Sequence, residues 1–253
     1  MKVLAITQAR TGSTRLPGKV LKTIGKQTLL DIHIHRILKS NKIDKLLIAT
    51  TLDKADDAIE KIAAEHQLPC YRGSTNDVLD RFYQAAIKYN PEWIVRITSD
   101  CPLIDANLID EVIDMALKTN SDYASNVLEP TFPNGTDVEV FKFSALETAW
   151  KNATLKSDRE HVTPYIYRNS TFRGGTLFES VNYTNPVNYA NVRMTVDEEA
   201  DFNVISLMVE KVGLEKDWKT YADLYLSDPE IMKLNKNIDR NEGYLKSLKD
   251  DNK

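Results

Sequence analysis

Residues 9–19 combine the charges and the backbone freedom that bind phosphate. This stretch carries three cationic, three hydroxyl and two glycine residues, and it directly follows the apolar run of residues 3–6. Glycine lets backbone N–H groups approach an anion, and Lys and Arg neutralise the anion's charge. A buried strand that opens into such a loop predicts a phosphate-binding site.

Two common nucleotide-binding motifs do not fit this loop. A P-loop has four residues between its glycines and a Ser or Thr after its Lys. Here five residues separate Gly12 from Gly18, and Val20 follows Lys19. The glycine pattern of dinucleotide-binding proteins is also absent from the sequence. We therefore expect a different kind of phosphate loop, and the alternative is a solvated basic turn.

Two aspartates that follow apolar runs are candidate metal ligands. Asp100 follows residues 93–98, and Asp197 follows residues 192–196. Mg²⁺ prefers one or two carboxylates together with phosphate oxygens and water, so the two side chains could bind one Mg²⁺ beside the phosphate loop. The alternatives are a turn or capping role for Asp100 and N-capping of the following helix for Asp197.

The histidines and cysteines offer less chemistry. His33 and His35 are two residues apart and therefore point to different sides of a helix, which disfavours a shared metal. Cys101 has no flanking general base, and we expect it to be a small buried neighbour of Asp100.

The first half of the chain predicts alternating strands and helices. Apolar runs predict buried strands at residues 3–6, 46–49 and 93–98, apolar residues at helical spacing predict helices at 28–38, 54–66, 78–86 and 105–117, and residues 71–74 are predicted to be a loop. Several of the runs are too continuously apolar for a one-sided sheet, which predicts a mostly parallel sheet with helices on both faces. Ligands bind outside the carboxyl ends of such strands, so the phosphate loop and Asp100 should face one pocket.

The second half is less regular. The patterns predict strands at residues 138–141 and 192–196, helices at 144–152 and 201–212, a helix opening at 157–161, and a polar helical tail beyond Trp218 that packs on the body or on a second subunit. No repeat or linker divides the chain.

Composition excludes several classes of protein. The 253 residues are 42% hydrophobic and 28% charged, with a formal net charge of −4, which is ordinary for a globular protein. No basic stripe suggests a nucleic-acid partner, and no apolar run approaches the roughly 20 residues of a membrane helix. The N-terminus enters a strand without a charged and apolar leader, and there is no Cys-x-x-Cys pair, so we expect a cytoplasmic protein.

The loop at residues 9–19 resembles the signature of the cytidylyltransferases that activate sugar acids, the CMP-Kdo and CMP-sialic acid synthetases. Over roughly residues 1–240, the chain is more similar still to the branch named for the spore coat polysaccharide biosynthesis protein F. The matching blocks are residues 71–74 with 77–81, 96–102, 134–141, 159–165 and 193–197.

The resemblance implies a fold and a division of labour along the chain. The fold would be a Rossmann-like α/β domain of the nucleotide-diphospho-sugar transferase type, with a small inserted β-rich or dimerisation region. A single domain, 1–253, would contain a nucleotide-binding half at about 1–120, an acceptor-binding half at about 121–215 and a helical C-terminal tail at about 216–253. The protein would form a homodimer.

The resemblance also implies roles for particular residues. Lys19, Arg10 and Asp100 would be catalytic, and Asp100 and Asp197 would hold Mg²⁺. The nucleotide-binding residues would be Ala9, Arg10, Gly12, Ser13, Arg15, Lys19, Arg72, Ser74, Asp77 and Arg81. The acceptor-binding residues would be Asn134, Asp137, Glu139, Arg159, Glu160 and His161.

The implied activity is Mg²⁺-dependent transfer of CMP from CTP to an acidic sugar or a similar anionic acceptor, with release of pyrophosphate, in surface polysaccharide or glycoconjugate precursor synthesis. One alternative is a non-sugar phosphate, phosphonate or alcohol acceptor. Another is a nucleotide-binding polysaccharide-assembly protein without turnover. A glycosyltransferase is disfavoured, because it would need an Asp-x-Asp pair at a strand end and none stands in an obvious place.

Overall fold

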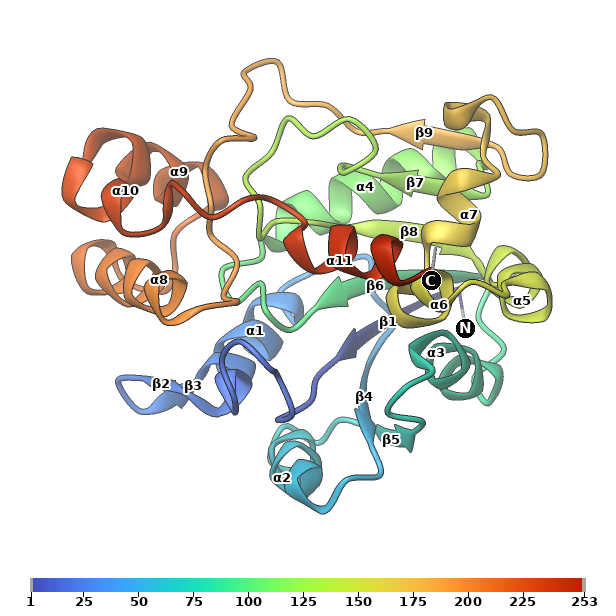
Figure 1. Ribbon diagram of the computed structural model, residues 1–253, viewed down its shortest axis with the longest axis horizontal. Helices are drawn as coiled ribbons and strands as arrows, with labels where there is room; N and C mark the ends of the chain where they lie inside the picture. Colours follow the sequence, from blue (N-terminus) through green and yellow to red (C-terminus); the bar gives the residue numbers. More distant parts are fainter. Residues whose placement is uncertain (1, 252–253) are drawn as a thin grey trace.

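A seven-stranded sheet runs through the protein (Figure 1). The computed structural model describes residues 2–251. The strand order is β5-β4-β1-β6-β8-β7-β9, and β2 and β3 pair separately. The strands are β1 (Val3–Gln8), β2 (Thr23–Ile24), β3 (Gln27–Thr28), β4 (Lys45–Thr51), β5 (Cys70–Gly73), β6 (Trp93–Thr98), β7 (Tyr123–Ser125), β8 (Glu139–Lys142) and β9 (Ser180–Asn182). Strands β5, β4, β1 and β6 are parallel, β8 is antiparallel to β6 and β7, and β9 is parallel to β7. The mostly parallel sheet predicted from the sequence is confirmed.

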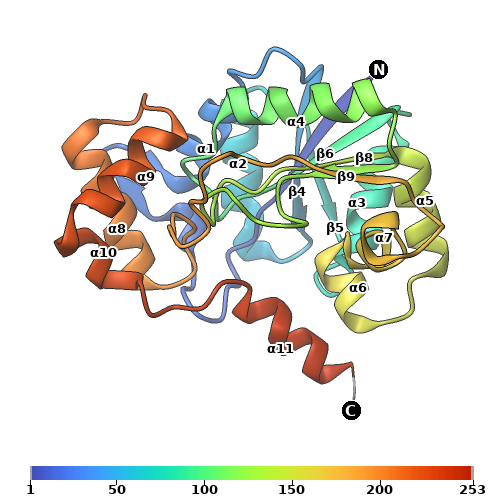
Figure 2. The same cartoon turned by 90° about the horizontal axis from the view of Figure 1, so that it is seen from above.

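Helices cover both faces of this sheet (Figure 2). The helices are α1 (Leu29–Ile37), α2 (Asp57–Glu65), α3 (Val78–Ile87), α4 (Ala106–Thr119), α5 (Phe143–Asn152), α6 (Lys156–His161), α7 (Pro164–Arg168), α8 (Glu199–Val212), α9 (Trp218–Ser227), α10 (Pro229–Asn235) and α11 (Glu242–Asp250). In β1, Val3 and Ala5 pack in one apolar core with α1, α2 and α4. Leu4 and Ile6 face the opposite core, with α3, α5 and α7. This alternation explains why β1 is apolar at successive positions.

Two groups of helices lie beyond these layers. Helices α8, α9 and α10 share a third core with α1 at one end of the sheet. Helix α11 crosses in front of the sheet and lies beside α6 (Figures 1 and 2). The tail therefore packs on the body of its own chain, which is one of the two arrangements expected for it, and its last two residues lie outside the described residues.

The strand order places a ligand cleft beside β1. The chain passes from β1 to β4 and β5 on one side, and then returns to β6 on the other side of β1. Ligands bind at such a switch point, outside the carboxyl ends of the strands. Gln8 and Thr98, the last residues of β1 and β6, are register partners, so the loop after β1 and Asp100 after β6 begin side by side.

Two local predictions from the sequence are wrong. Residues 71–74 are not a loop, because Cys70–Gly73 forms the edge strand β5, which pairs in parallel with β4. Residues 192–196 are not a ladder strand, because the segment makes one isolated bridge, from Arg193 to Asn134. Met194 and Val196 in this segment are apolar because they are buried against α8 and α9. Strand β5 escaped prediction for a different reason, because a half-buried edge strand gives little periodicity.

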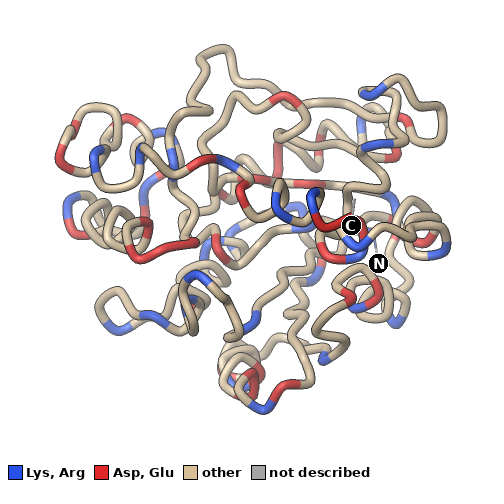
Figure 3. Tube along the Cα trace, viewed as in Figure 1, with Lys and Arg blue, Asp and Glu red and all other residues tan. Residues whose placement is uncertain are grey.

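Charged residues are distributed over the whole molecule. Acidic and basic positions are interspersed along the trace, and residues 197–201 form an acidic stretch at the start of α8 (Figure 3). Within residues 2–251, no helix combines the length and the apolar character that crossing a membrane requires.

Candidate active site

The loop after β1 is anchored at both of its ends. Thr11 donates two hydrogen bonds, from its backbone N and its Oγ1, to Asp56 Oδ1, both at 2.7 Å. Gly18 N donates to Thr11 O at 2.8 Å, and Gly18 adopts φ 68°, which favours glycine. Asp56 itself is buried, and its other oxygen accepts from Thr51 at the end of β4. The loop is therefore closed and fixed to the edge of the sheet.

Lys19 lies between the two candidate metal ligands. Its Nζ donates to Asp197 Oδ1 at 2.9 Å, to Val196 O at 2.7 Å and to Asp100 Oδ2 at 3.4 Å. Burial opposes the charge on Lys19, but the two carboxylates outweigh it and raise the pKa of Lys19 above its usual value. Burial likewise opposes the charge on Asp100, but Lys19 and nearby hydrogen bonds lower the pKa of Asp100 to about 2. Lys19 and Asp100 are therefore both charged at neutral pH.

The segment that carries Asp197 is held directly against Asp100. Val196 N donates to Asp100 O at 2.7 Å, and Thr195 Oγ1 donates to the same oxygen at 3.2 Å. Asp197 N donates to the buried Asp201, whose two oxygens accept from Arg193 at 2.8 Å. Glu198 rather than Asp197 is the N-cap of α8, so the capping alternative for Asp197 is not observed.

These two aspartates fit a magnesium ion that also binds phosphate. Both carboxylates reach one cationic nitrogen, so a small cation at that place would contact both. In residues 2–251 there is no cluster of three or more His, Cys, Asp or Glu that could hold a metal. Mg²⁺ commonly takes one or two carboxylates and completes its shell with phosphate oxygens and water, which matches this donor set.

Arg15 connects the phosphate loop to α11. Its Nη2 lies 3.0 Å from Asp197 Oδ1, and its Nη1 lies 3.2 Å from Glu242 Oε2 at the first residue of α11. Residues of α11 also meet the predicted acceptor side, since Ser247 Oγ donates to Glu160 Oε2 and lies 3.0 Å from His161 Nε2. Helix α11 thus crosses the front of the site and contacts both the phosphate loop and the predicted acceptor side.

A cleft of about 570 Å³ adjoins this cluster. Its lining includes four predicted acceptor-binding residues and three residues of the charged cluster: Asn134, Asp137, Glu139, His161, Arg15, Asp100 and Asp197. Asp137 accepts from Arg240 Nη2 at 2.9 Å, and Glu139 accepts from Tyr123 Oη at 2.6 Å and pairs with Arg96. Burial raises the pKa of Asp137 despite Arg240, and burial lowers the pKa of His161.

Arg81 forms a second buried cationic position. It is 2% exposed, it donates to Ser74 O at 2.5 Å, and no protein atom accepts from its Nε. Burial and the nearby charge of Arg10 lower the pKa of Arg81 to about 10. The Oε1 of Gln8, directly before the phosphate loop, is also buried without a partner. Arg10, Ser74 and Arg81 therefore lie near one another, and their nucleotide-binding role stays a prediction.

Several predicted site residues have other local partners. Arg72 turns to α2, where it pairs with Asp57 at 2.6 Å and with Glu60 at 3.0 Å. Asp77 is the N-cap of α3 and pairs with Arg159 at 2.5 Å, so these two residues bind each other. The structure does not bring Arg72, Asp77 or Arg159 to the cleft.

The small residues of the loop make few side-chain contacts within the protein. Ala9 is buried, and its N donates to Ala49 O. Ser13 Oγ accepts from Leu16 N at 3.4 Å, and a Cβ added at Gly12 would meet nothing within 4 Å. No protein neighbour therefore explains a glycine at position 12.

The remaining candidates for chemistry are structural. Cys101 is buried, burial raises the pKa of its thiol, and its Sγ lies 3.5 Å from Asp100 Oδ1, which fits the expected small neighbour of Asp100. His33 is buried, whereas His35 is half exposed and lies near Glu215, so the two rings do point to different sides.

Sequence reasoning missed part of the cleft. Arg96 was not assigned to the site, although it lies opposite the predicted Glu139 in the antiparallel pair of β6 and β8. This pairing becomes visible only once the strand order is known. Arg240, Glu242 and Tyr244 come from the polar tail, where nothing in the local sequence distinguishes them from solvated surface residues.

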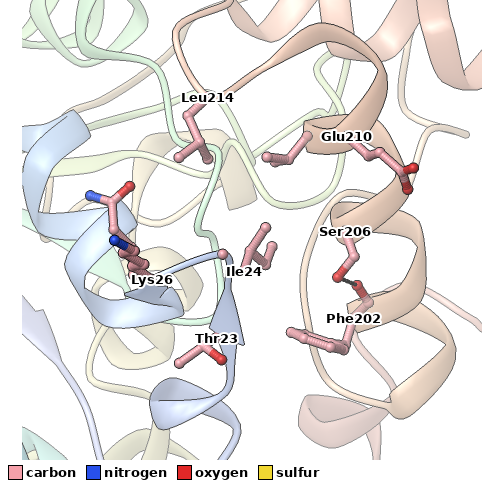
Figure 4. A pocket seen from close by; sticks show the side chains of 10 residues that line it. Thr23, Ile24, Lys26, Phe202, Ser206, Glu210 and Leu214 are labelled. Carbon is pink, nitrogen blue, oxygen red and sulfur yellow. Dashed lines mark hydrogen bonds between the residues drawn. The ribbon is translucent and has the colours of Figure 1, made fainter.

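A second cavity, of about 590 Å³, lies between the β2–β3 hairpin and α8 (Figure 4). Ile24, Phe202 and Leu214 give it a mostly apolar lining, with Lys26 and Glu210 at its rim. None of the predicted site residues lines it, so we place the functional site at the strand ends.

Comparison with known proteins shows the family of the chain. The family model described as cytidylyltransferase matches residues 4–221. The chain is 41% identical to the uncharacterized protein MJ1063 of Methanocaldococcus jannaschii over 244 residues, 94% of this chain and 96% of that protein. It is 33% identical to the spore coat polysaccharide biosynthesis protein SpsF of Bacillus subtilis, over 85% of this chain and 89% of that protein. The solved structure of a cytidylyltransferase from Leptospira borgpetersenii superimposes with a TM-score of 0.87 and 32% identity, over 95% of this chain and all of that one.

Proposed function

This chain belongs to the cytidylyltransferase family, and from that premise we propose that it transfers CMP from CTP to an acidic sugar and releases pyrophosphate. The name of its SpsF relative favours a role in precursor synthesis for surface polysaccharides or glycoconjugates. A homodimer in the cytoplasm, as expected from the sequence, is part of the same proposal.

One observation carries the proposal. Lys19, Arg15, Asp100 and Asp197 come from three distant segments, and three ion pairs of 2.9 to 3.4 Å link them at the switch point of the sheet. Nucleotidyl transfer needs cations that bind a triphosphate next to carboxylates that bind its metal ion. A solvated basic turn would not place its lysine between two partly buried aspartates.

The chain's own residues would act by position and charge. An acceptor hydroxyl would lose its proton to solvent while its oxygen attacks the α-phosphorus in line, and the bond to the departing pyrophosphate would break on the opposite side. Lys19 and Arg15 would neutralise charge on the departing pyrophosphate, and Arg10 and Arg81 would hold the nucleotide on the β1–β4 side. Asp100 and Asp197 would hold Mg²⁺, which when bound supplies Lewis-acid activation of a phosphoryl oxygen and of the acceptor hydroxyl.

The cleft chemistry favours a polyhydroxylated acid as the acceptor. Arg96 and Arg240 are each paired with a carboxylate of the cleft, so the lining alternates donors and acceptors at short range. Carboxylates such as Asp137 and Glu139 accept hydrogen bonds from sugar hydroxyls, whereas they repel a phosphate dianion. An acceptor that carries one carboxylate and several hydroxyls fits this lining better than a small phosphate or phosphonate does.

The test is a pyrophosphate-release screen with Mg²⁺. Four nucleoside triphosphates are crossed with a panel of sugar acids, neutral sugars, phosphates and phosphonates. We expect release with CTP and at least one sugar acid, and a loss of about 10²-fold or more in Asp100→Asn, by analogy with other preorganised charge contacts. Asp114→Asn, at an exposed aspartate of α4 that pairs with Lys42, is the matched control and should keep full activity.

Each other outcome rejects a defined part of the proposal. Release only with phosphates or phosphonates would reject the sugar acid. CTP binding without release in any combination would reject turnover and favour a nucleotide-binding assembly protein. Full activity of Asp100→Asn would reject the metal assignment.

A further inference from the structure

We propose that Lys19 occupies the place of the divalent cation between Asp100 and Asp197 in the free protein, and that the metal enters only when nucleotide phosphates draw Lys19 away. This inference rests on the proposed function, because it takes the two aspartates as the metal ligands. It adds an exchange of cations, and with it an order of binding, to the site.

The position of Lys19 supports this exchange. Its side chain is 13% exposed, and its ammonium group reaches both carboxylates and the Val196 carbonyl oxygen. These three acceptors satisfy the three N–H groups that an ammonium can donate. A divalent ion that contacted both aspartates would have to share this place, so Lys19 and the metal exclude each other.

The surrounding positive charges lower the affinity of the nucleotide-free site for a metal ion. Asp197 is also within 3.0 Å of Arg15 and within 3.5 Å of Arg193. With Lys19 in place, a second cation would face three positive groups and two carboxylates that are already paired. Like charges at such distances repel strongly where water is partly excluded.

Nucleotide phosphates would reverse this balance. Lys19 and Arg15 both belong to the phosphate loop, so a triphosphate bound there offers Lys19 new anionic partners. Departure of Lys19 takes one cation away from each of two partly buried carboxylates, which is costly unless another cation replaces it. The phosphate oxygens then complete the ligand set that two carboxylates alone do not provide.

The experiment uses Mn²⁺ as the probe and water proton relaxation as the readout, because Mn²⁺ held by the slowly tumbling protein enhances relaxation and Mn²⁺ bound to free CTP does not. The full chain is titrated with Mn²⁺ alone and with Mn²⁺ plus CTP, without an acceptor. Wild type, Lys19→Met and Lys22→Met are compared. Lys22 pairs with Glu199 outside the cleft, so Lys22→Met is the matched control.

We expect wild type and Lys22→Met to show enhancement only when CTP is present. Lys19→Met should bind Mn²⁺ without nucleotide at least about tenfold more tightly than wild type, a change of about 1.4 kcal/mol. Mn²⁺ should also raise the Tm of Lys19→Met and leave that of wild type unchanged. Adding Asp100→Asn to Lys19→Met should abolish both effects.

Two results would overturn the inference in distinguishable ways. Equal binding of Mn²⁺ to wild type and Lys19→Met without CTP would reject the exchange and leave the proposed function standing. Absence of enhancement in every protein, with and without CTP, would reject the metal assignment and the exchange together. Lys19→Gln, which keeps a donor but no charge, is a second variant in case Lys19→Met does not fold, and the same tenfold criterion applies to it.

Discussion

His33 lies wholly inside the protein, between β1 and the turn that carries Asp100. A hydrogen bond of 2.9 Å joins its Nδ1 to Cys101 O, and one of 2.8 Å joins its Nε2 to Thr7 Oγ1. A carbonyl oxygen can only accept, so the proton of the neutral ring is on Nδ1 and Thr7 donates to Nε2. Burial lowers the pKa of His33 to about 4. The neutral ring therefore fixes the turn next to Asp100.

This buried ring predicts a loss of stability in mild acid. The pKa of His33 is about 6.5 in the unfolded chain and about 4 in the folded one. Its contribution is complete above pH 6.5 and decreases as the pH falls from 6.5 to 4, because only the unfolded state takes up the proton. Between pH 7.5 and pH 5, wild type should lose about 2 kcal/mol from this group, measured by urea unfolding.

The control is His33→Asn, whose amide N–H can replace Nδ1 but does not titrate. It should be less stable than wild type at pH 7.5 and should show a smaller difference between the two pH values. An unchanged pH dependence in this variant would assign the acid sensitivity to other groups.

At the scale of elements, the turn at Gly135 positions the segment that carries Asp197. Asn134 N donates to Val192 O at 2.9 Å, and Met194 N donates to Asn134 O at 2.7 Å. Gly135 has φ 106°, and a Cβ there would lie 2.5 Å from the backbone of Met194 and Thr195. The close approach of two backbones thus acts together with the side chains of Thr195, Arg193 and Asp201 to set the place of Asp197.

Gly135→Ala should therefore be destabilising and should impair the site. We expect a loss of at least about 2 kcal/mol, because backbone strain adds to a clash with backbone that cannot move aside easily. Thermal unfolding and CTP turnover are the measurements. Gly174→Ala is the control, since Gly174 has φ 78° but nothing within 4 Å of an added Cβ. Equal losses in the two variants would reject the close approach as the cause.

The elements also show how much the sequence could predict. The predicted bounds of long apolar runs such as β6 and of periodic helices such as α4 agree with the structure to within two residues. Their signals are local, since burial on both faces or on one stripe dictates the residue types. Strands β7 and β9, of three residues each, and the edge strand β5 carry too few residues for a periodic pattern.

The candidate site could be predicted only in part for a related reason. Lys19, Asp100 and Asp197 follow strands or apolar runs, and that position marks them as residues of the strand ends. The family resemblance assigns Arg72 to the nucleotide, but Arg72 lies within β5 and pairs with acidic residues of α2. Arg240 and Glu242 reach the site because the C-terminal tail packs across it. The path of the tail depends on packing between distant segments and has no local signature in the sequence.

At the scale of the whole molecule, α11 links the phosphate loop to the acceptor side. Glu242 pairs with Arg15, and the ring of Tyr244 meets the ring of His161 edge-on at 5.2 Å. If Arg15 binds the nucleotide phosphates as proposed, the Glu242 carboxylate would compete with them, because one guanidinium cannot fully pair with both. This competition is weak, since Glu242 is 58% exposed.

Removing that competition should tighten nucleotide binding. We expect Glu242→Gln to bind CTP about twofold to fivefold more tightly than wild type at low salt, and equally at 1 M salt, where exposed charges are screened. Isothermal titration calorimetry measures both affinities. Glu230→Gln, at an exposed glutamate of α10 that pairs with Lys233, should leave them unchanged. Weaker binding in Glu242→Gln would indicate instead that Glu242 orients Arg15 for the nucleotide.

The bridge between Lys19 and Asp197 also has a consequence for how the protein is made. The two residues are 178 positions apart, so at about 5–20 residues per second a ribosome needs roughly 9–36 s to add the second after the first. During that interval the loop after β1 has already been synthesised, but its partner from the second half does not yet exist. The growing chain therefore passes through a period in which Lys19 can pair with Asp100 but not yet with Asp197.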